Sequence, residues 1–171
     1  METRTKSFAS IQSEVEHFTE TLKAHIDVVD LQPLFFRLTL NTTMAVLFGK
    51  SMEDLEKQAA ISEVEFARAF DHAQHRLAER GRLGDYYWLL GGKGFRRSCK
   101  MVHDFVDAIV VDALREADTH DNKESSSAPD RYIFIQALIS QTKDRTILRD
   151  QVINILLAGR DTTACLLSWT L

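Results

Sequence analysis

Apolar residues recur every three or four positions through most of the chain, which places them on one face of successive helices. Only two prolines and seven glycines occur among the 171 residues, so few positions interrupt helical segments. The sequence therefore predicts an all-α fold, with a first helix over about residues 5 to 25. The apolar face of this helix is formed by Phe8, Ile11, Val15, Phe18 and Leu22.

Cap and turn residues set the bounds of the next two helices. Pro33 suits a first helical turn, and Gly49 suits the position just after a helix end. Ser62 and Glu65 have the spacing of a capping box, which predicts a third helix that ends at about residue 80. The residues between the first two helices, 27–33, would form either a short strand or an extended linker.

A glycine-rich aromatic segment, residues 81–95, interrupts the helical spacing. It holds five glycines together with Tyr86, Tyr87 and Trp88, which predicts a loop with one short helical turn. Basic residues flank the aromatic ones on both sides, a mixture suited to peripheral contact with a membrane interface. On the pattern alone, the aromatic side chains could equally pack inward as part of the core.

Three further helices bring the predicted total to six. The fourth helix follows an apolar stripe that ends near Ala117. Residues 118–130 are polar, serine-rich and without periodicity, which predicts a solvated, mobile loop. Asp130 is an N-cap candidate for a short fifth helix, and Asp144 or Thr146 for the last one. All six helices would belong to one domain that covers the whole chain.

Composition narrows the possible functions. The formal net charge is −4 and no basic tail is present, so binding of nucleic acid by electrostatic attraction has no support. The two cysteines, Cys99 and Cys165, lie far apart and form no CxxC or Cys/His cluster. Neither a disulfide scaffold nor a structural zinc site is therefore indicated, and a reducing compartment is expected.

The last apolar stretch, residues 153–171, carries the polar run GRDTT in its middle. Glycine in a helix costs roughly 1 kcal/mol relative to alanine, and adjacent threonines are poor helix formers. The hydroxyls of Thr162 and Thr163 can bond back to carbonyls one turn earlier and loosen the helix. Asp161 beside Thr162 would form a pair able to pass protons to a bound small molecule. Alternatively, Arg160 and Asp161 are a solvated or paired charge couple at an exposed helix edge.

The stretch LLAGRDTTACLLSWTL resembles the central distal helix of the cytochromes P450, the haem-thiolate monooxygenases. Segments that cover most of residues 28–171 also resemble, in the same order, the fifth helix and the substrate-lid helices of fungal members that act on alkanes and fatty acids. The resemblance implies a partial P450 fold. The motif of the distal helix, Ala/Gly-Gly-x-Asp/Glu-Thr-Thr, is filled by Ala158, Gly159, Asp161, Thr162 and Thr163.

The same resemblance implies haem b as cofactor, dioxygen as co-substrate, and electrons that come from NADPH through a reductase. Ala158 and Gly159 would lie against the haem, with Thr162 and Thr163 also in contact with it. Thr162 would hydrogen-bond the dioxygen and help to protonate it, and Asp161 would belong to the proton relay. The substrate would be a lipophilic alkane or fatty acid. The complete protein would lie at the cytoplasmic face of the endoplasmic reticulum membrane.

Two elements of the family pattern have no match. The thiolate loop has the form F-x-x-G-x-R-x-C-x-G, but around Cys99 only Arg97 falls in register, and Cys165 lies on the distal helix itself. The family's E-x-x-R pair belongs downstream of that helix, whereas the strings at Glu65 and Glu79 come too early. No metal ligand is therefore assigned. The chain is expected to be an interior fragment of a longer protein, without a membrane anchor and inactive by itself.

A rival interpretation remains open. The chain could be a non-catalytic helical binding or scaffold module, or a degenerate relic, in which the GRDTT run is only a polar seam. The coding sequence beyond Leu171 discriminates between the two interpretations, because a monooxygenase would continue into the E-x-x-R pair and the cysteine loop.

Overall fold

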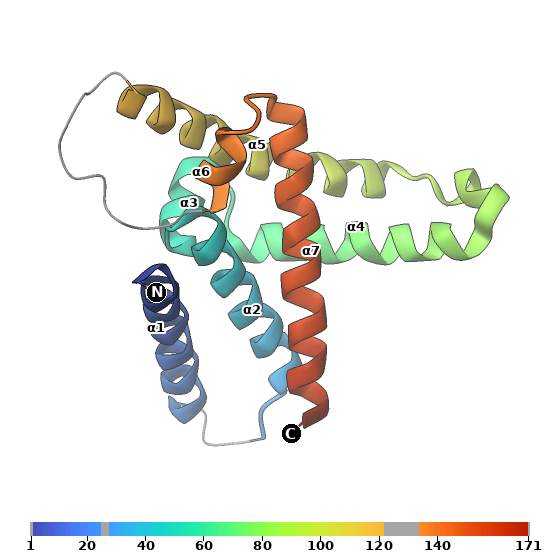
Figure 1. Cartoon of the computed structure of the whole chain (residues 1–171). Coiled ribbons are helices and arrows are strands. Elements are labelled where there is room, and N and C mark those ends of the chain that lie inside the picture. Colours follow the sequence, from blue (N-terminus) through green and yellow to red (C-terminus); the bar gives the residue numbers. More distant parts are fainter. Residues whose placement is uncertain (1, 25–27, 122–133, 171) are drawn as a thin grey trace.

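The computed structural model describes residues 2–24, 28–121 and 134–170, and every regular element within those ranges is helical. One long helix, α7, stands at the centre, and the antiparallel pair α4 and α5 runs across it and meets at a distant tip (Figure 1). In chain order the elements are α1 (Glu2–Ala24), α2 (Leu31–Phe48), α3 (Met52–Ala59), α4 (Glu63–Leu83), the 3₁₀-helix η1 (Gly84–Leu90), α5 (Lys93–Asp121), α6 (Phe134–Ile139) and α7 (Arg145–Thr170).

The all-α prediction is confirmed, but α3 was not among the six expected helices. It begins after Ser51, whose hydroxyl accepts a hydrogen bond from the Asp54 backbone nitrogen at 3.3 Å. Only Met52 and Leu55 of this helix are buried. Two buried residues are too few for helical periodicity to stand out in the sequence, so the cap at Ser51 was the one usable signal.

The predicted caps of α2 and α4 are confirmed. Gly49 adopts the left-handed conformation with φ 67°, and its N–H donates to the Ala45 carbonyl at 2.8 Å. Glycine suits this position because it has no Cβ to clash there. Ser62 and Glu65 form the reciprocal capping box, in which each side chain accepts from the other residue's backbone N–H. The end of α2 and the start of α4 are thus fixed by local chemistry.

The predicted glycine-rich loop is shorter than expected. The ends of segment 81–95 belong to α4 and α5, and the short helical turn within it is η1. Residues 28–30 have no regular structure, which confirms the linker and not the strand there, whereas residues 31–33 already belong to α2. The helix α5 continues to Asp121, so the predicted start of a loop at residue 118 is wrong. The rest of segment 118–130, including the Asp130 cap, lies outside the described residues.

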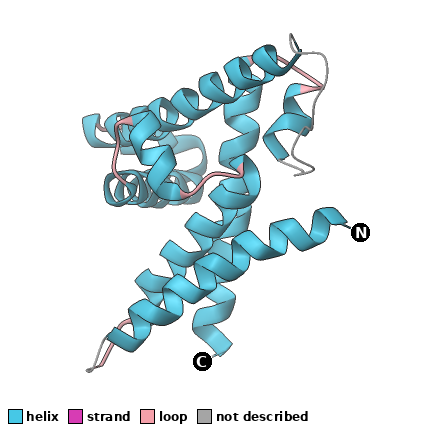
Figure 2. Ribbon diagram, turned by 90° about the vertical axis from the view of Figure 1, so that its left-hand side faces the viewer, coloured by secondary structure: helices cyan, strands magenta, loops and turns pink. Residues whose placement is uncertain are grey.

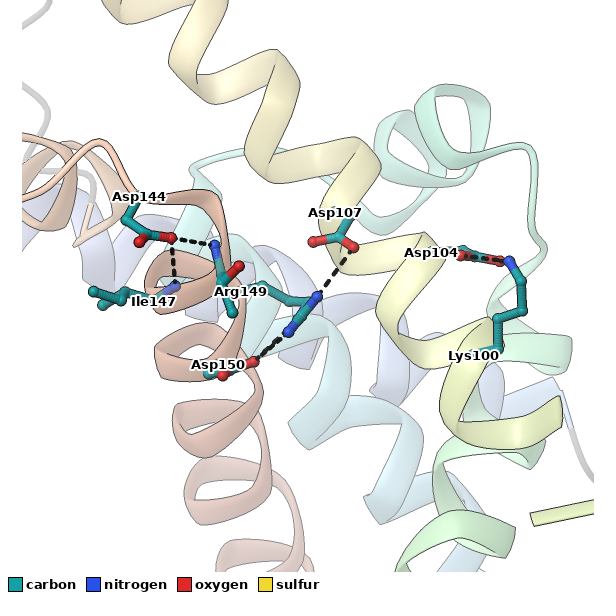
Figure 3. Close-up of polar contacts among 8 residues, drawn as sticks. Lys100, Asp104, Asp107, Asp144, Ile147, Arg149 and Asp150 are labelled. Atoms are coloured by element: carbon teal, nitrogen blue, oxygen red, sulfur yellow. Dashed lines mark hydrogen bonds and ion pairs between the residues drawn. The ribbon is translucent and has the colours of Figure 1, made fainter. Parts of the chain in front are cut away.

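The start of α7 is fixed by its own cap and by an ion pair to α5. Asp144 accepts hydrogen bonds from the backbone nitrogens of Thr146 and Ile147 at 2.8 and 3.3 Å, so Asp144 rather than Thr146 is the cap. Arg149 of α7 reaches Asp107 of α5, with Nη1 3.4 Å from Oδ2 (Figure 3). The first turns of α7 are therefore held by a local cap and by one contact with α5.

The core lies where α2, α4 and α5 meet the first half of α7. Its centre contains Phe66 of α4 against Phe105 of α5, with ring centroids 4.2 Å apart. Figure 2 shows the helices from the side, joined by short loops at several corners. Within the described ranges, no helix is both long and apolar enough to cross a membrane.

Candidate functional site

The polar run of α7 lies inside an unbroken helix. Leu148, Val152, Leu156 and Ala164 are buried at intervals of four residues, and Arg160 occupies the same register with only 2% of its surface exposed. Arg160 therefore takes a core position. The interpretation of Arg160 and Asp161 as a charge couple is right about pairing, but Arg160 is not solvated.

Arg160 is enclosed by side chains from three helices. Its guanidinium carbon lies 4.9 Å from the ring centroid of Phe36 in α2 and 5.4 Å from that of Phe70 in α4. Its Nη1 lies 2.6 Å from Oδ1 of Asp71 in α4 and 3.4 Å from Oδ1 of Asp161. Its buried Nε has no hydrogen-bond partner. The charge is thus held by two aromatic faces and two carboxylates.

Thr162 lies on the opposite, exposed side of α7. Its hydroxyl donates to the Ala158 carbonyl at 2.6 Å, which confirms the predicted bond back to the preceding turn for Thr162 but not for Thr163. Ala158, Thr162, Leu166 and Trp169 recur at helical spacing and are all exposed, with Trp169 at 85% and Leu166 at 63%. A mostly apolar stripe with one hydroxyl in it therefore runs along this side of α7.

Gly159 and Thr163 face a different neighbour. A Cβ at Gly159 would lie 2.8 Å from the hydroxyl oxygen of Thr43 in α2, so glycine makes room here for another helix. Gly159 and Thr163 also line an apolar cavity of about 410 Å³ between α1, α2, α6 and α7. Of the four predicted haem contacts, Ala158 and Thr162 thus belong to the exposed stripe, while Gly159 and Thr163, of which Thr163 is also exposed, line the cavity beside α2.

Neither cysteine is suited to supply a thiolate ligand to a group bound on the exposed stripe of α7. Burial raises the pKa of the Cys99 thiol, an effect that the positive charge of Arg80 opposes only in part, so the thiol form is favoured. Cys165 is exposed and lies on α7 itself. Cys165 therefore could not ligate a group bound against α7 from the side of that group that faces away from the helix.

The exposed stripe fits one face of a flat apolar ring such as haem. Ala158 leaves room beside the backbone, and Leu166 supplies uncovered apolar surface next to the Thr162 hydroxyl. The described residues contain no cluster of three or more side chains that could hold a metal ion. The stripe thus offers apolar surface to one face of such a ring, with the Thr162 hydroxyl beside it.

The tip between α4 and α5 is the second unusual region. Tyr86, Tyr87, Trp88 and Leu89 of η1 are all more than half exposed, so the alternative in which they pack into the core is wrong. Arg80 lies over the rings of Tyr87 and Phe95, with its guanidinium carbon 5.1 and 4.9 Å from their centroids. The aromatic side chains and the basic residues thus share one exposed surface.

Sequence reasoning missed Asp71 as a functional candidate. It pairs with Arg160 across 89 positions of sequence, and its helix segment contains no motif that marks it. The available signal was the arginine itself, because a cation among apolar residues spaced four apart predicts a buried partner.

Comparisons with known proteins identify the family of the chain. The family model described as cytochrome P450 matches residues 2–171. A protein named cytochrome P450 from Arthroderma benhamiae is 47% identical over all of this chain and 34% of its own length. Cytochrome P450 52A9 from Candida maltosa is 40% identical over 92% of this chain and 32% of its own length.

A third relative, cytochrome P450 monooxygenase g430 from a Fusarium species, is 40% identical over 84% of this chain and 27% of its own length. The chain thus spans about a third of the length of these curated relatives. No solved structure gives a significant match. Because the family model covers nearly every residue, the chain belongs to the cytochrome P450 family.

Proposed function

We propose that this chain is the dioxygen-facing part of a haem-dependent monooxygenase that hydroxylates an alkane or a fatty acid. The observation that carries the proposal is the exposed Thr162 hydroxyl within an apolar stripe of α7, with Asp161 next to it in sequence. The match of the P450 family model over residues 2–171 supports the same conclusion. Named relatives that include a monooxygenase support the reaction class.

Haem b would supply the binding and two-electron reduction of dioxygen, with electrons that come from NADPH through a reductase. The overall reaction combines the substrate C–H bond, dioxygen, two protons and two electrons to give an alcohol and water. Two protons must therefore reach a water-poor site. The task of this chain would be to hold one face of the ring and to deliver those protons.

Ala158 and Thr162 would hold the ring on the exposed side of α7. The Thr162 hydroxyl donates its proton to the Ala158 carbonyl. The lone pairs of the hydroxyl oxygen therefore stay free to accept a second hydrogen bond. A half-turn of the hydroxyl would let it donate outward. Asp161 is partly exposed and can exchange protons with water, which suits it to replenish the proton that Thr162 gives up.

Gly159 and Thr163 would act less directly. The contact between Gly159 and Thr43 would set how closely α7 approaches α2. This distance would in turn set the position of the exposed stripe of α7 relative to α2. Thr163 lines the cavity on that same side. We include both residues in the site as its support on the α2 side.

A peripheral membrane contact is also part of the proposal. Tyr86, Trp88 and Leu89 at the tip of the α4–α5 pair are exposed and flanked by arginines and lysines. Aromatic residues beside cations suit the interface between water and lipid. A location at the cytoplasmic face of the endoplasmic reticulum would bring this tip to a membrane in which lipophilic substrates dissolve.

The decisive test is Thr162→Ala in the holoenzyme that carries these residues. Loss of the hydroxyl should divert reduced dioxygen to hydrogen peroxide and lower the yield of alcohol per dioxygen by about tenfold or more. Thr170→Ala is the matched control, since Thr170 also bonds back to a carbonyl of α7, that of Leu166 at 3.1 Å. An equal yield in the two variants, or a protein that binds no haem, would reject the proposed function.

A further inference from the structure

Arg160 is held in place more tightly than a surface cation, because α2 and α4 each supply an aromatic ring next to it. Phe36 and Phe70 lie within 4.9 and 5.4 Å of its guanidinium carbon, and 2% of the residue is exposed. The group can therefore pivot only between the partners next to it. Those partners are the carboxylates of Asp71 and Asp161.

Both carboxylates approach the same nitrogen. Nη1 lies 2.6 Å from Oδ1 of Asp71 and 3.4 Å from Oδ1 of Asp161, which makes the first contact a strong hydrogen bond and the second a long one. Asp71 belongs to α4, whereas Asp161 is next to Thr162 on α7. The position of α4 therefore decides how much of the Arg160 charge is left for Asp161.

The geometry is not the one that maximises stability. A nearby pair, Arg37 of α2 and Glu63 of α4, uses both prongs of the fork, with Nε to Oε1 at 2.8 Å and Nη2 to Oε2 at 3.0 Å. Arg160 instead meets Asp71 end-on and leaves its buried Nε without a partner. An apolar side chain between the two phenyl rings would avoid that cost.

We propose that Arg160 is a positioning residue that couples α4 to the acid beside Thr162. While Asp71 holds Nη1, the Asp161 carboxylate is only weakly tethered and can turn toward Thr162. When α4 withdraws Asp71, Arg160 swings to Asp161 and holds it away from the hydroxyl. The relevance to proton delivery rests on the proposed function, whereas the exchange of partners does not.

The exchange can be measured without haem. In the full chain labelled with nitrogen-15 at arginine, NMR reports how fast the Arg160 guanidinium rotates about its Nε–Cζ bond. Asp71→Asn alone should leave that rotation slow, because Asp161 takes over the bond. The double variant Asp71→Asn/Asp161→Asn should speed it about tenfold. All substitutions are isosteric and lie at partly exposed carboxylates, so the fold should tolerate them.

Glu63→Gln is the matched control, because it should free Arg37 and leave Arg160 unchanged. If Asp71→Asn alone frees Arg160 completely, or if the double variant leaves its rotation slow, the exchange of partners is refuted. In the holoenzyme, Asp71→Asn should raise the share of dioxygen lost as hydrogen peroxide by about three- to tenfold with KM unchanged.

A peroxide share in Asp71→Asn equal to that in Glu63→Gln would overturn the coupling to proton delivery. Failure of the proposed function looks different: Thr162→Ala would then have no effect either, while the NMR result would stand by itself.

Discussion

The centre of α7 buries a charged side chain, whereas the tip of the α4–α5 pair exposes large apolar ones, and both depart from the usual distribution of residues in a folded protein. Arg160 is 2% exposed in the core, whereas Trp88 is 63% exposed at the tip. Burying a charge is costly without partners, and leaving a large apolar side chain in water forfeits about 1.5 to 3 kcal/mol. Each departure therefore marks a place where stability alone does not explain the residue.

The two departures differ in how they are compensated. Arg160 has two carboxylates and two aromatic rings around it, so the fold itself supplies its partners. At the tip, Arg80 covers one face of Tyr87, but Trp88 and Leu89 stay uncovered. The first departure points to a function inside the molecule, and the second to a partner outside it.

The largest expected effect comes from replacing Arg160, where two substitutions distinguish the contribution of its volume from that of its charge. Arg160→Ala should lower the free energy of unfolding by about 2 to 4 kcal/mol, because it leaves a gap between Phe36 and Phe70. Arg160→Met should stay within about 1 kcal/mol of the natural chain, because it fills that gap without a charge. Urea denaturation measures both values. A loss in the methionine variant as large as in the alanine variant would show that the charge itself stabilises the core.

Gly159 tests whether the polar run of α7 is shaped by its neighbour α2. Gly159→Ala should lower the free energy of unfolding by about 1 to 3 kcal/mol, since its Cβ would lie 2.8 Å from the Thr43 hydroxyl oxygen. Gly81→Ala in α4 is the control: nothing lies within 4 Å of its Cβ, and it should stabilise by up to about 1 kcal/mol. Thermal unfolding distinguishes the two, and equal shifts would mean that the helix contact is unimportant.

The tip should matter for membranes and hardly for stability. Replacing Trp88 and Leu89 together by serine should weaken binding to vesicles of anionic lipid by about tenfold, a change of about 1.4 kcal/mol. Unfolding should shift by no more than about 0.5 kcal/mol, because both side chains are already exposed. Val64→Ser, an exposed apolar position on α4 away from the tip, is the control in a flotation assay. Unchanged flotation of the double variant would leave the exposed aromatic residues without their proposed partner.

The smallest effect comes from an ordinary, partly exposed charge cluster, which serves as the reference for Arg160. Burial would lower the pKa of Lys50, but hydrogen bonds and charge from Glu116 and Asp112 outweigh it, and the pKa is raised above 10.5. A raised pKa for a lysine means stabilisation that is complete below pH 10.5 and lost as the pH rises through the folded value. The stabilisation should be below about 1 kcal/mol, because solvent screens the cluster.

Denaturation curves from about pH 9 to pH 11.5 check this expectation, and the loss of stability should appear only above pH 10.5, as the pH rises toward the folded pKa of Lys50. Lys50→Gln should remove the decline that belongs to Lys50. If the natural chain and the variant decline in parallel, the cluster does not stabilise the fold.

Local signals predicted three helices that carry their own caps, namely α2, α4 and α7. Gly49, Asp144 and the Ser62–Glu65 box act within one turn of the chain, so their effect can be read from neighbouring residues. The helix α3 was missed because its two buried residues form no periodic stripe. The extent of α5 was underestimated because its polar last turns lack an apolar pattern, although they continue the helix.

In the candidate site too, contacts within one helix could be predicted from the sequence and contacts between helices could not. The bond from Thr162 to the Ala158 carbonyl connects residues four apart on one helix, and the sequence predicted it. The approach of Thr43 to Gly159 and the bond from Asp71 to Arg160 join separate helices, and no local pattern marks them. The grouping of Gly159 and Thr163 with Ala158 and Thr162 against haem stays a prediction, and the structure adds that Gly159 and Thr163 line a cavity shared with α2.

By itself, the sequence determined the helical class, most helix ends and the motif that identifies the family, because each depends on residues within a few positions of one another. The tertiary structure alone decided which side of α7 stays open, which carboxylate holds Arg160 and that Trp88 is uncovered. These outcomes depend on how distant helices cross. Crossing is set by the packing of whole helix faces and by the space that single residues such as Gly159 leave between them.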